Sequence, residues 1–201
     1  MSKNHNWYIA GISLIGVAVG IVFCGAFSNV MHWAGSTPFC GEFCHSMDVT
    51  YAAYKKGLHY NTRSGMHAGC SDCHLLNYAN EHNNPIEYTA MLLDKANAGT
   101  HSLIGEIQGS LSTPEKQIAE RERMAKHVRD QMKERNFSNC RACHDVTAMN
   151  NPKKKMISKF HQKMTVDAEP KVDCVACHKN AGHDYKAAQA EIDAIVAASK
   201  K

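Results

Sequence analysis

The longest apolar stretch of the chain lies near its start, where no charged residue occurs between Trp7 and Met31. An α-helix rises about 1.5 Å per residue, so this stretch forms a helix of about 37 Å, long enough for a hydrocarbon layer of about 30 Å. A cleaved signal peptide is the alternative, because Lys3 precedes the stretch, but its apolar core of about 7–15 residues is shorter. The pattern therefore predicts a membrane anchor over residues 7–31, with aromatic residues at both of its ends.

Apolar positions later in the chain follow helical periodicity. The stretch Ser112–Glu115 combines a capping box with a proline at the helix start, and strong helix formers follow from Lys116 to Glu134. Within this predicted helix Met124, Val128 and Met132 recur every four residues, which gives it one apolar face.

The end of the chain predicts a further helix over residues 185–198. Its apolar face consists of Tyr185, Ala188, Ile192 and Ile195. No stretch alternates between apolar and polar residues as a strand does, so the predicted class is mainly α with long loops.

The cysteines indicate more about function than the apolar pattern does. The chain has 201 residues, nine cysteines and a formal net charge of +4. Eight cysteines form four pairs, each directly followed by a histidine: the strict C-x-x-C-H motifs Cys70–His74, Cys140–His144 and Cys174–His178, and Cys40–His45, which is one residue longer. The mild charge does not indicate a nucleic-acid surface, so no nucleic-acid partner is expected.

The C-x-x-C-H spacing is typical of c-type haem attachment, in which two cysteines on one short turn bind the haem and the adjacent histidine ligates iron. Zinc sites also use C-x-x-C pairs, but zinc does not require a histidine after every pair. The sequence therefore predicts four covalently bound haem c groups, here numbered haem 1 to haem 4 in chain order. The predicted attachment residues are Cys40, Cys44, Cys70, Cys73, Cys140, Cys143, Cys174 and Cys177, and the predicted proximal ligands are His74, His144 and His178.

Four haems in so short a chain leave little room for an independent apolar core, and we expect the haems to take its place. Haem is attached to such motifs outside the cytoplasm. We therefore predict a short cytoplasmic segment at residues 1–6, the anchor at 7–31 and a periplasmic tetrahaem domain at 32–201. The protein is expected in the inner (cytoplasmic) membrane with a single span.

The predicted haem domain consists of two copies of a two-haem repeat. After His45 and His144 a lone histidine follows 14 and 17 residues later, and the next motif begins 11 and 13 residues beyond it. Equivalent positions in a repeat tend to have equivalent roles, so the two lone histidines, His59 and His161, are candidate sixth ligands. His183 is a third candidate. An iron with two histidine ligands has no free coordination position, so such a haem transfers electrons and does not bind a substrate.

The first motif differs from the other three. Its extra residue changes how the turn presents His45 to the iron, and Met47 lies two residues further on. A methionine thioether raises the potential of a haem relative to two histidines. Met47 is therefore the predicted ligand of haem 1, with His45 as a second candidate, and this unusual iron nearest the anchor is where substrate chemistry is expected.

The anchor, the four motifs and the Cys44–Met47 run resemble the membrane-anchored tetrahaem quinol dehydrogenases of the NapC/NirT family, which includes NrfH. The stretches His59–Gly65 and Cys177–His183 are specific matches. The resemblance implies oxidation of menaquinol or ubiquinol at haem 1 and electron transfer through haems 2–4 to a periplasmic terminal reductase, such as a nitrite or nitrate reductase. It also implies Met47 as the ligand of haem 1, and His59, His161 and His183 as distal ligands of the other haems. The sequence leaves open whether the protein forms a homo-oligomer.

Two positions depart from the family pattern. The family has two residues between its first cysteines, whereas this chain has three. The family also has an Asp six or seven residues after a Lys, over the open face of haem 1. If Lys95 is that Lys, no carboxylate follows at this spacing. Since quinol oxidation releases protons, Asp94 or His101 is the candidate base, Lys95 the candidate quinol-binding residue, and His101 also a candidate haem 1 ligand.

Two other functions compete with quinol oxidation. The chain could be a reductase of a small nitrogen or sulfur compound at an open haem 1. It could also be a passive, membrane-tethered carrier that never meets a quinone. The anchor leading directly into the first motif favours the quinol dehydrogenase.

Overall fold

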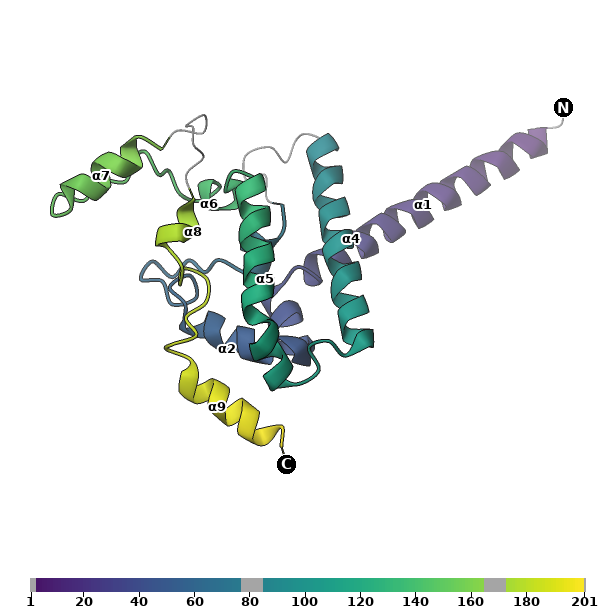
Figure 1. The fold of residues 1–201 in the computed structure, drawn as a ribbon. Coiled ribbons are helices and arrows are strands. Elements are labelled where there is room, and N and C mark those ends of the chain that lie inside the picture. Colours follow the sequence, from purple (N-terminus) through teal and green to yellow (C-terminus); the bar gives the residue numbers. More distant parts are fainter. Residues whose placement is uncertain (1–2, 77–84, 165–172, 201) are drawn as a thin grey trace.

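A computed structural model describes residues 3–76, 85–164 and 173–200 of the chain (Figure 1). In these ranges the secondary structure is helical and contains no strand, which confirms the predicted mainly α class. The elements are α1 (Lys3–Trp33), η1 (Phe39–Phe43), η2 (His45–Met47), α2 (Asp48–Lys56), α3 (Cys70–His74), α4 (Pro85–Gln108), α5 (Pro114–Glu134), α6 (Ser138–Arg141), α7 (Lys155–Gln162), α8 (Cys174–Cys177) and α9 (Gln189–Ala198).

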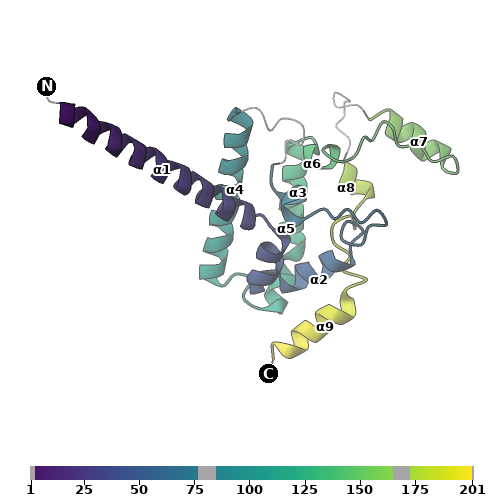
Figure 2. The ribbon, with the colours of Figure 1, turned by 180° about the vertical axis from the view of Figure 1, so that it is seen from behind.

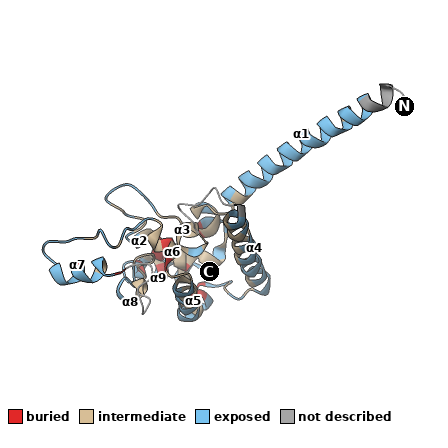
Figure 3. Cartoon of the chain, turned by 90° about the horizontal axis from the view of Figure 1, so that it is seen from above, coloured by how far each residue is buried: buried red, intermediate tan, exposed pale blue. Residues whose placement is uncertain are grey.

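Helix α1 projects from the rest of the molecule (Figures 1 and 2). The most apolar 18-residue part of its segment Trp7–Trp33 has a mean hydropathy of 2.4, and none of that part is buried in the protein. Figure 3 shows the exposed colouring along this helix. A helix of this length and composition can cross a membrane, and it contains the predicted anchor at residues 7–31.

The apolar core of the body is small and lies between α2 and α9. It consists of Val49, Ala52, Ala53, Ala188 and Ile192, most of which have short side chains. Tyr185 and Ile195 pack against it, so the predicted apolar face of the C-terminal segment is the face that contacts the core. Helix α9 begins at Gln189 and not at Tyr185. The residues before it form a turn, in which Gln189 N donates a hydrogen bond to the carbonyl of Lys186, three residues earlier.

Helix α5 begins as the sequence predicts. Thr113 is its N-cap and accepts a hydrogen bond from Lys116 N at 3.4 Å, and Pro114 is the first helical residue. Beyond Glu134 the backbone takes positive φ values at Asn136 (49°) and Phe137 (53°), and this reversal leads into α6. The buried Phe137 ring stabilises that turn.

Helix α4 lies on the side of the body from which α1 leaves (Figures 1 and 3). Three charged side chains of α4 bind the rest of the protein. Asp94 forms an ion pair with Arg135 at 2.7 Å, Lys95 donates a hydrogen bond to the carbonyl of Met31 in α1, and Glu106 accepts one from Ser46. Helix α4 therefore connects the end of α1 with the first cysteine motif.

Candidate functional site: four Cys-Cys-His turns and their histidines

Each cysteine motif occupies one short helical turn. The three strict motifs begin or end in α3, α6 and α8, which are turns of four or five residues. The longer first motif forms a π-helical turn, η1. A π turn bonds residue i to i+5 and so contains about one more residue than an α turn, which is how Cys40 and Cys44 remain neighbours on one turn.

The motifs contact one another in chain order. The Cys40 and Cys70 thiols share a hydrogen bond, which raises the pKa of Cys40 above its usual range. The third and fourth motifs meet in the same way, because Cys140 and Cys174 share a hydrogen bond that raises the pKa of Cys140. The first motif thus adjoins the second, and the third adjoins the fourth.

The second and third motifs are joined by Asn139, which lies directly before Cys140 and is buried. Its Nδ2 donates hydrogen bonds to the carbonyls of Asp72 at 2.7 Å and Leu75 at 2.5 Å. Burial raises the pKa of Cys73 to about 11, and nearby Cys143 adds to the rise. The four motifs therefore form one continuous series that begins near the end of α1.

Six histidines lie in three pairs, each joining a motif histidine to a histidine from elsewhere. The ring centroids of His74 and His183 are 6.1 Å apart. Those of His144 and His59 are 6.0 Å apart, and those of His178 and His161 are 6.2 Å apart. All three lone histidines that the sequence singles out thus lie opposite a motif histidine.

The three lone histidines also share one hydrogen-bonding pattern. Nδ1 of His59 contacts the carbonyl of Ala181 at 2.8 Å, and Nδ1 of His161 contacts that of Ile157 at 2.9 Å. Nδ1 of His183 lies 3.3 Å from the carbonyl of Thr50. A carbonyl can only accept, so Nδ1 carries the proton and donates it, which leaves Nε2 with its lone pair.

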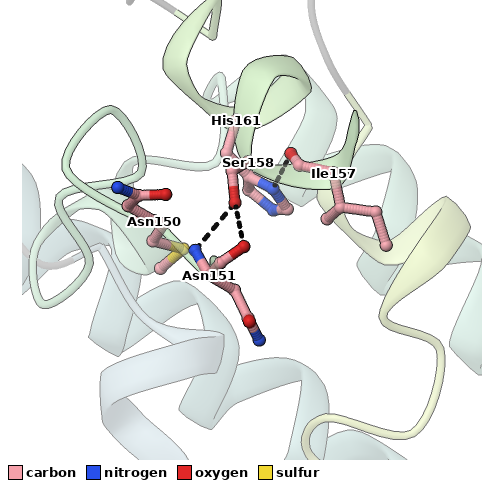
Figure 4. A pocket seen from close by; sticks show the side chains of 6 residues that line it. Asn150, Asn151, Ile157, Ser158 and His161 are labelled. Carbon is pink, nitrogen blue, oxygen red and sulfur yellow. Dashed lines mark hydrogen bonds between the residues drawn. The ribbon is translucent and has the colours of Figure 1, made fainter. Parts of the chain in front are cut away.

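A hollow of about 340 Å³ adjoins one of these histidines (Figure 4). It is lined by Met149, Asn150, Asn151, Ile157, Ser158 and His161. The Ser158 hydroxyl donates to the carbonyl of Asn151 at 3.2 Å and accepts from its backbone N–H at 2.7 Å, which fixes the loop against α7.

The first motif presents its histidine differently. The His45 side chain is 92% exposed, and its Nδ1 lies 3.7 Å from Asp48. Its backbone carbonyl accepts a hydrogen bond from Gln117 Nε2 at 2.9 Å. Met47 is half-buried and precedes α2 as its N-cap residue.

The predicted quinol-binding segment lies in α4. Burial lowers the pKa of the Lys95 amine, although nearby Cys40 opposes this effect. Asp94 binds Arg135 and also accepts from Leu76 N at 2.8 Å, so both of its oxygens have partners. His101 is exposed. The structure therefore brings Lys95 close to the first motif and turns Asp94 towards α5.

Comparison with known proteins decides the family. The model of the NapC/NirT cytochrome c family, N-terminal region, matches residues 2–188. The chain belongs to this family. It is 31% identical over 191 residues to the denitrification system component NirT of Stutzerimonas stutzeri, covering 94% of this chain and 89% of NirT.

Two further relatives are cytochrome c-type proteins of Escherichia coli K12. NapC is 36% identical over 172 residues, covering 85% of this chain and 79% of NapC. TorC is 31% identical over 180 residues, covering 90% of this chain and 43% of TorC. No solved structure matches the chain. Family membership and the apolar α1 make this NapC/NirT-type protein a membrane-anchored cytochrome with covalently bound haem c that functions in electron transfer.

The histidine pairs of this NapC/NirT-type cytochrome fit axial ligands of haem. A metal–nitrogen bond of about 2 Å brings each ring centroid to about 3 Å from the metal, so two axial rings lie about 6 Å apart. The three observed separations agree with this value. Metal-ligating histidines usually donate their other ring N–H to a carbonyl or carboxylate, and the Nδ1 bonds of the three lone histidines follow this pattern.

One acidic residue at the first motif was not among the site residues predicted from the sequence. Glu106 accepts a hydrogen bond from Ser46, and its charge adds to the effect of burial in raising the pKa of Cys44. Glu106 follows Lys95 by 11 residues, which is close to three helical turns, so both lie on one face of α4. This spacing of 11 residues is the feature of the sequence from which Glu106 could have been predicted.

Proposed function

We propose that this cytochrome oxidises menaquinol or ubiquinol at haem 1 and passes the electrons through haems 2–4 to a periplasmic terminal reductase. The observation that carries the proposal is the continuous series of motifs that begins at the end of α1. A lipid-soluble donor would meet the series at its first member, and a water-soluble acceptor at its last. Each bound haem supplies a one-electron carrier.

We assign the ligands from the histidine pairs. His74 and His183 would hold haem 2, His144 and His59 haem 3, and His178 and His161 haem 4. With a histidine on both faces these irons would have no open position, which suits carriers that do no substrate chemistry. Met47 remains the proposed ligand of haem 1, since the His45 side chain extends into solvent.

The quinol site would use residues of α4 that face the first motif. The Lys95 Nζ would donate a hydrogen bond to a quinol oxygen, and its position beside Cys40 of the first motif supports this role. Oxidation of a quinol also releases two protons. The Glu106 carboxylate would accept one of these protons and solvent water the other, supported by the contact of Glu106 with Ser46, whereas Asp94 binds Arg135. His101 is an exposed alternative acceptor and the other candidate haem 1 ligand.

The proposed topology follows from the chemistry of haem attachment. Residues 1–6 would lie in the cytoplasm, and residues 32–201 in the periplasm, with α1 crossing the inner membrane. The terminal reductase would then be a separate periplasmic protein. The relatives support such a partner, since one is named a component of a denitrification system.

Quinol-driven haem reduction in the purified, haem-loaded protein tests the proposal. We expect a menaquinol analogue to reduce the haems, and Lys95→Leu and Glu106→Gln to slow this reduction while dithionite still reduces all four haems. Lys126→Leu, which changes an exposed lysine of α5, is the matched control and should behave as the parent. Unchanged quinol rates in both α4 variants would refute this quinol site, and a parent protein inert to quinol would favour the passive carrier.

A further inference from the structure

Helix α4 exposes large apolar side chains along one face. Leu93 is 66% exposed, Leu103 61%, Ile104 45% and Ile107 78%. At about 100° per residue these four residues fall on one side of the helix, which we call the outer stripe. Ala96 and Thr100 lie between them on the same side, so no charged residue interrupts the stripe.

The charged residues of α4 around the stripe point the other way. Asp94 binds Arg135, Lys95 binds the carbonyl of Met31, and Glu106 accepts a hydrogen bond from Ser46. A helix that faced water on its outer side would carry charged side chains there. Helix α4 instead turns these charges to the protein and its apolar residues outward.

Helix α4, which carries the outer stripe, adjoins the membrane anchor. The Lys95 bond to Met31 fixes α4 to the last turns of α1, and both views show α4 on the side of the body from which α1 leaves (Figures 1 and 3). Trp33 at the end of α1 is 53% exposed and meets Phe43, which is 68% exposed, at a ring separation of 6.0 Å. Phe43 lies between the two cysteines of the longer first motif, so exposed aromatic rings continue from the anchor to that motif.

We infer that α4 is an interfacial helix whose outer stripe lies in the headgroup region of the lipid bilayer that α1 spans. Interfacial helices lie in the membrane plane and insert an apolar face about 5–10 Å into the headgroup and acyl boundary. Tryptophan and other aromatic residues occupy the same depth, in keeping with Trp33 and Phe43. Helix α4, which carries the stripe, is bound to the end of α1 and lies on the side of the body from which α1 leaves, and this position favours lipid over a second copy of the chain as the occupant of the stripe.

The consequence concerns the first motif. Glu106 and Lys95 tie the inner side of α4 to Ser46 and to the end of α1, so an α4 seated in the interface holds this motif at headgroup depth. The inference needs only the membrane anchor and does not depend on quinol oxidation.

Photocrosslinking in the full, haem-loaded chain tests the inference. Leu103 or Ile107 is replaced by p-benzoylphenylalanine, and the protein is irradiated in phosphatidylethanolamine–phosphatidylglycerol liposomes and examined by mass spectrometry. Phe160 of α7, which is 54% exposed and far from α1, receives the same replacement as the control. We expect lipid adducts from positions 103 and 107 and none from position 160.

Two results would overturn the inference. Adducts between two chains at positions 103 and 107 would identify the outer stripe as a contact between copies, and the absence of any adduct would mean that it faces water. A second variant provides a further check: Ile107→Glu should lose the lipid adduct from position 103, whereas Met156→Glu on α7, where Met156 is 85% exposed, should keep it. The haem absorption spectrum verifies that both variants fold.

Discussion

The buried amide of Gln117 connects three parts of the structure, and its replacement by methionine should destabilise the protein strongly. Gln117 is 4% exposed. Its Oε1 accepts from Val49 N at 3.0 Å, and its Nε2 donates to the carbonyls of His45 at 2.9 Å and Leu111 at 3.1 Å. The side chain thereby holds the start of α2 and the end of the first motif against α5.

The magnitude follows from the groups that Gln117→Met leaves without partners. Methionine has similar length, so the substitution removes hydrogen bonds with little change in volume. Val49 is 1% exposed, and its N–H lies in the first turn of α2, where no intrahelical acceptor exists. An unsatisfied buried donor costs about 1–3 kcal/mol and each of the two other lost bonds about 0.5–1.5 kcal/mol, so the free energy of unfolding should fall by about 2–6 kcal/mol.

Thermal unfolding of the detergent-solubilised, haem-loaded protein, followed by far-ultraviolet circular dichroism, measures this effect. A loss of about 3 kcal/mol should lower the Tm by about 6–12 °C for a chain of this size. Gln189→Met is the matched control, because Gln189 is exposed and its side chain bonds only to Asp193, at 2.8 Å, among the contacts of the described chain. Equal Tm values for the two variants would refute the reasoning.

Three further predictions follow from local contacts. Gly41→Ala should cost about 1–3 kcal/mol in urea unfolding, because a Cβ there would lie 2.4 Å from Tyr51 Cδ2, whereas Gly99→Ala, with nothing within 4 Å, should not destabilise. Thr113→Ala should remove the N-cap of α5 and cost about 1 kcal/mol, an effect that Thr113→Ser should largely restore if the hydroxyl is responsible. The hydrogen bond from Lys55 lowers the pKa of Glu191, so its contribution is present above the usual carboxyl pKa of about 4.3 and is lost as pH falls through the lowered value. Glu191→Gln should therefore lower stability at neutral pH by about 0.5–1 kcal/mol and flatten its acid dependence, and an unchanged pH profile would contradict this.

Elements set by neighbouring residues could be predicted from the sequence. The uncharged run from Trp7 to Met31 predicts the anchor inside α1, because the length and polarity of one segment decide whether it can span a bilayer. Thr113 and Pro114 predict the start of α5, since a cap acts within one turn. The same holds for the cysteine turns, whose spacing is a local property of the backbone.

Contacts between distant segments could not be predicted in this way. The repeat treats His59 and His161 as equivalent, yet His161 lies opposite His178 of its own unit, whereas His59 lies opposite His144 of the other unit. His183 likewise reaches back to His74. Sequence spacing cannot assign these partners, because the path of the chain between the two units decides them.

The face that α4 turns to the first motif was also decided only by tertiary structure. The sequence supplies Asp94, Lys95 and Glu106, but the ion pair with Arg135 takes up Asp94 and the contact with Ser46 brings Glu106 to the motif. These residues lie on one helix, and its rotation is set by partners more than 40 residues away in the chain. Sequence therefore determined which groups the protein has and the turns that carry them, whereas long-range packing determined which of those groups meet.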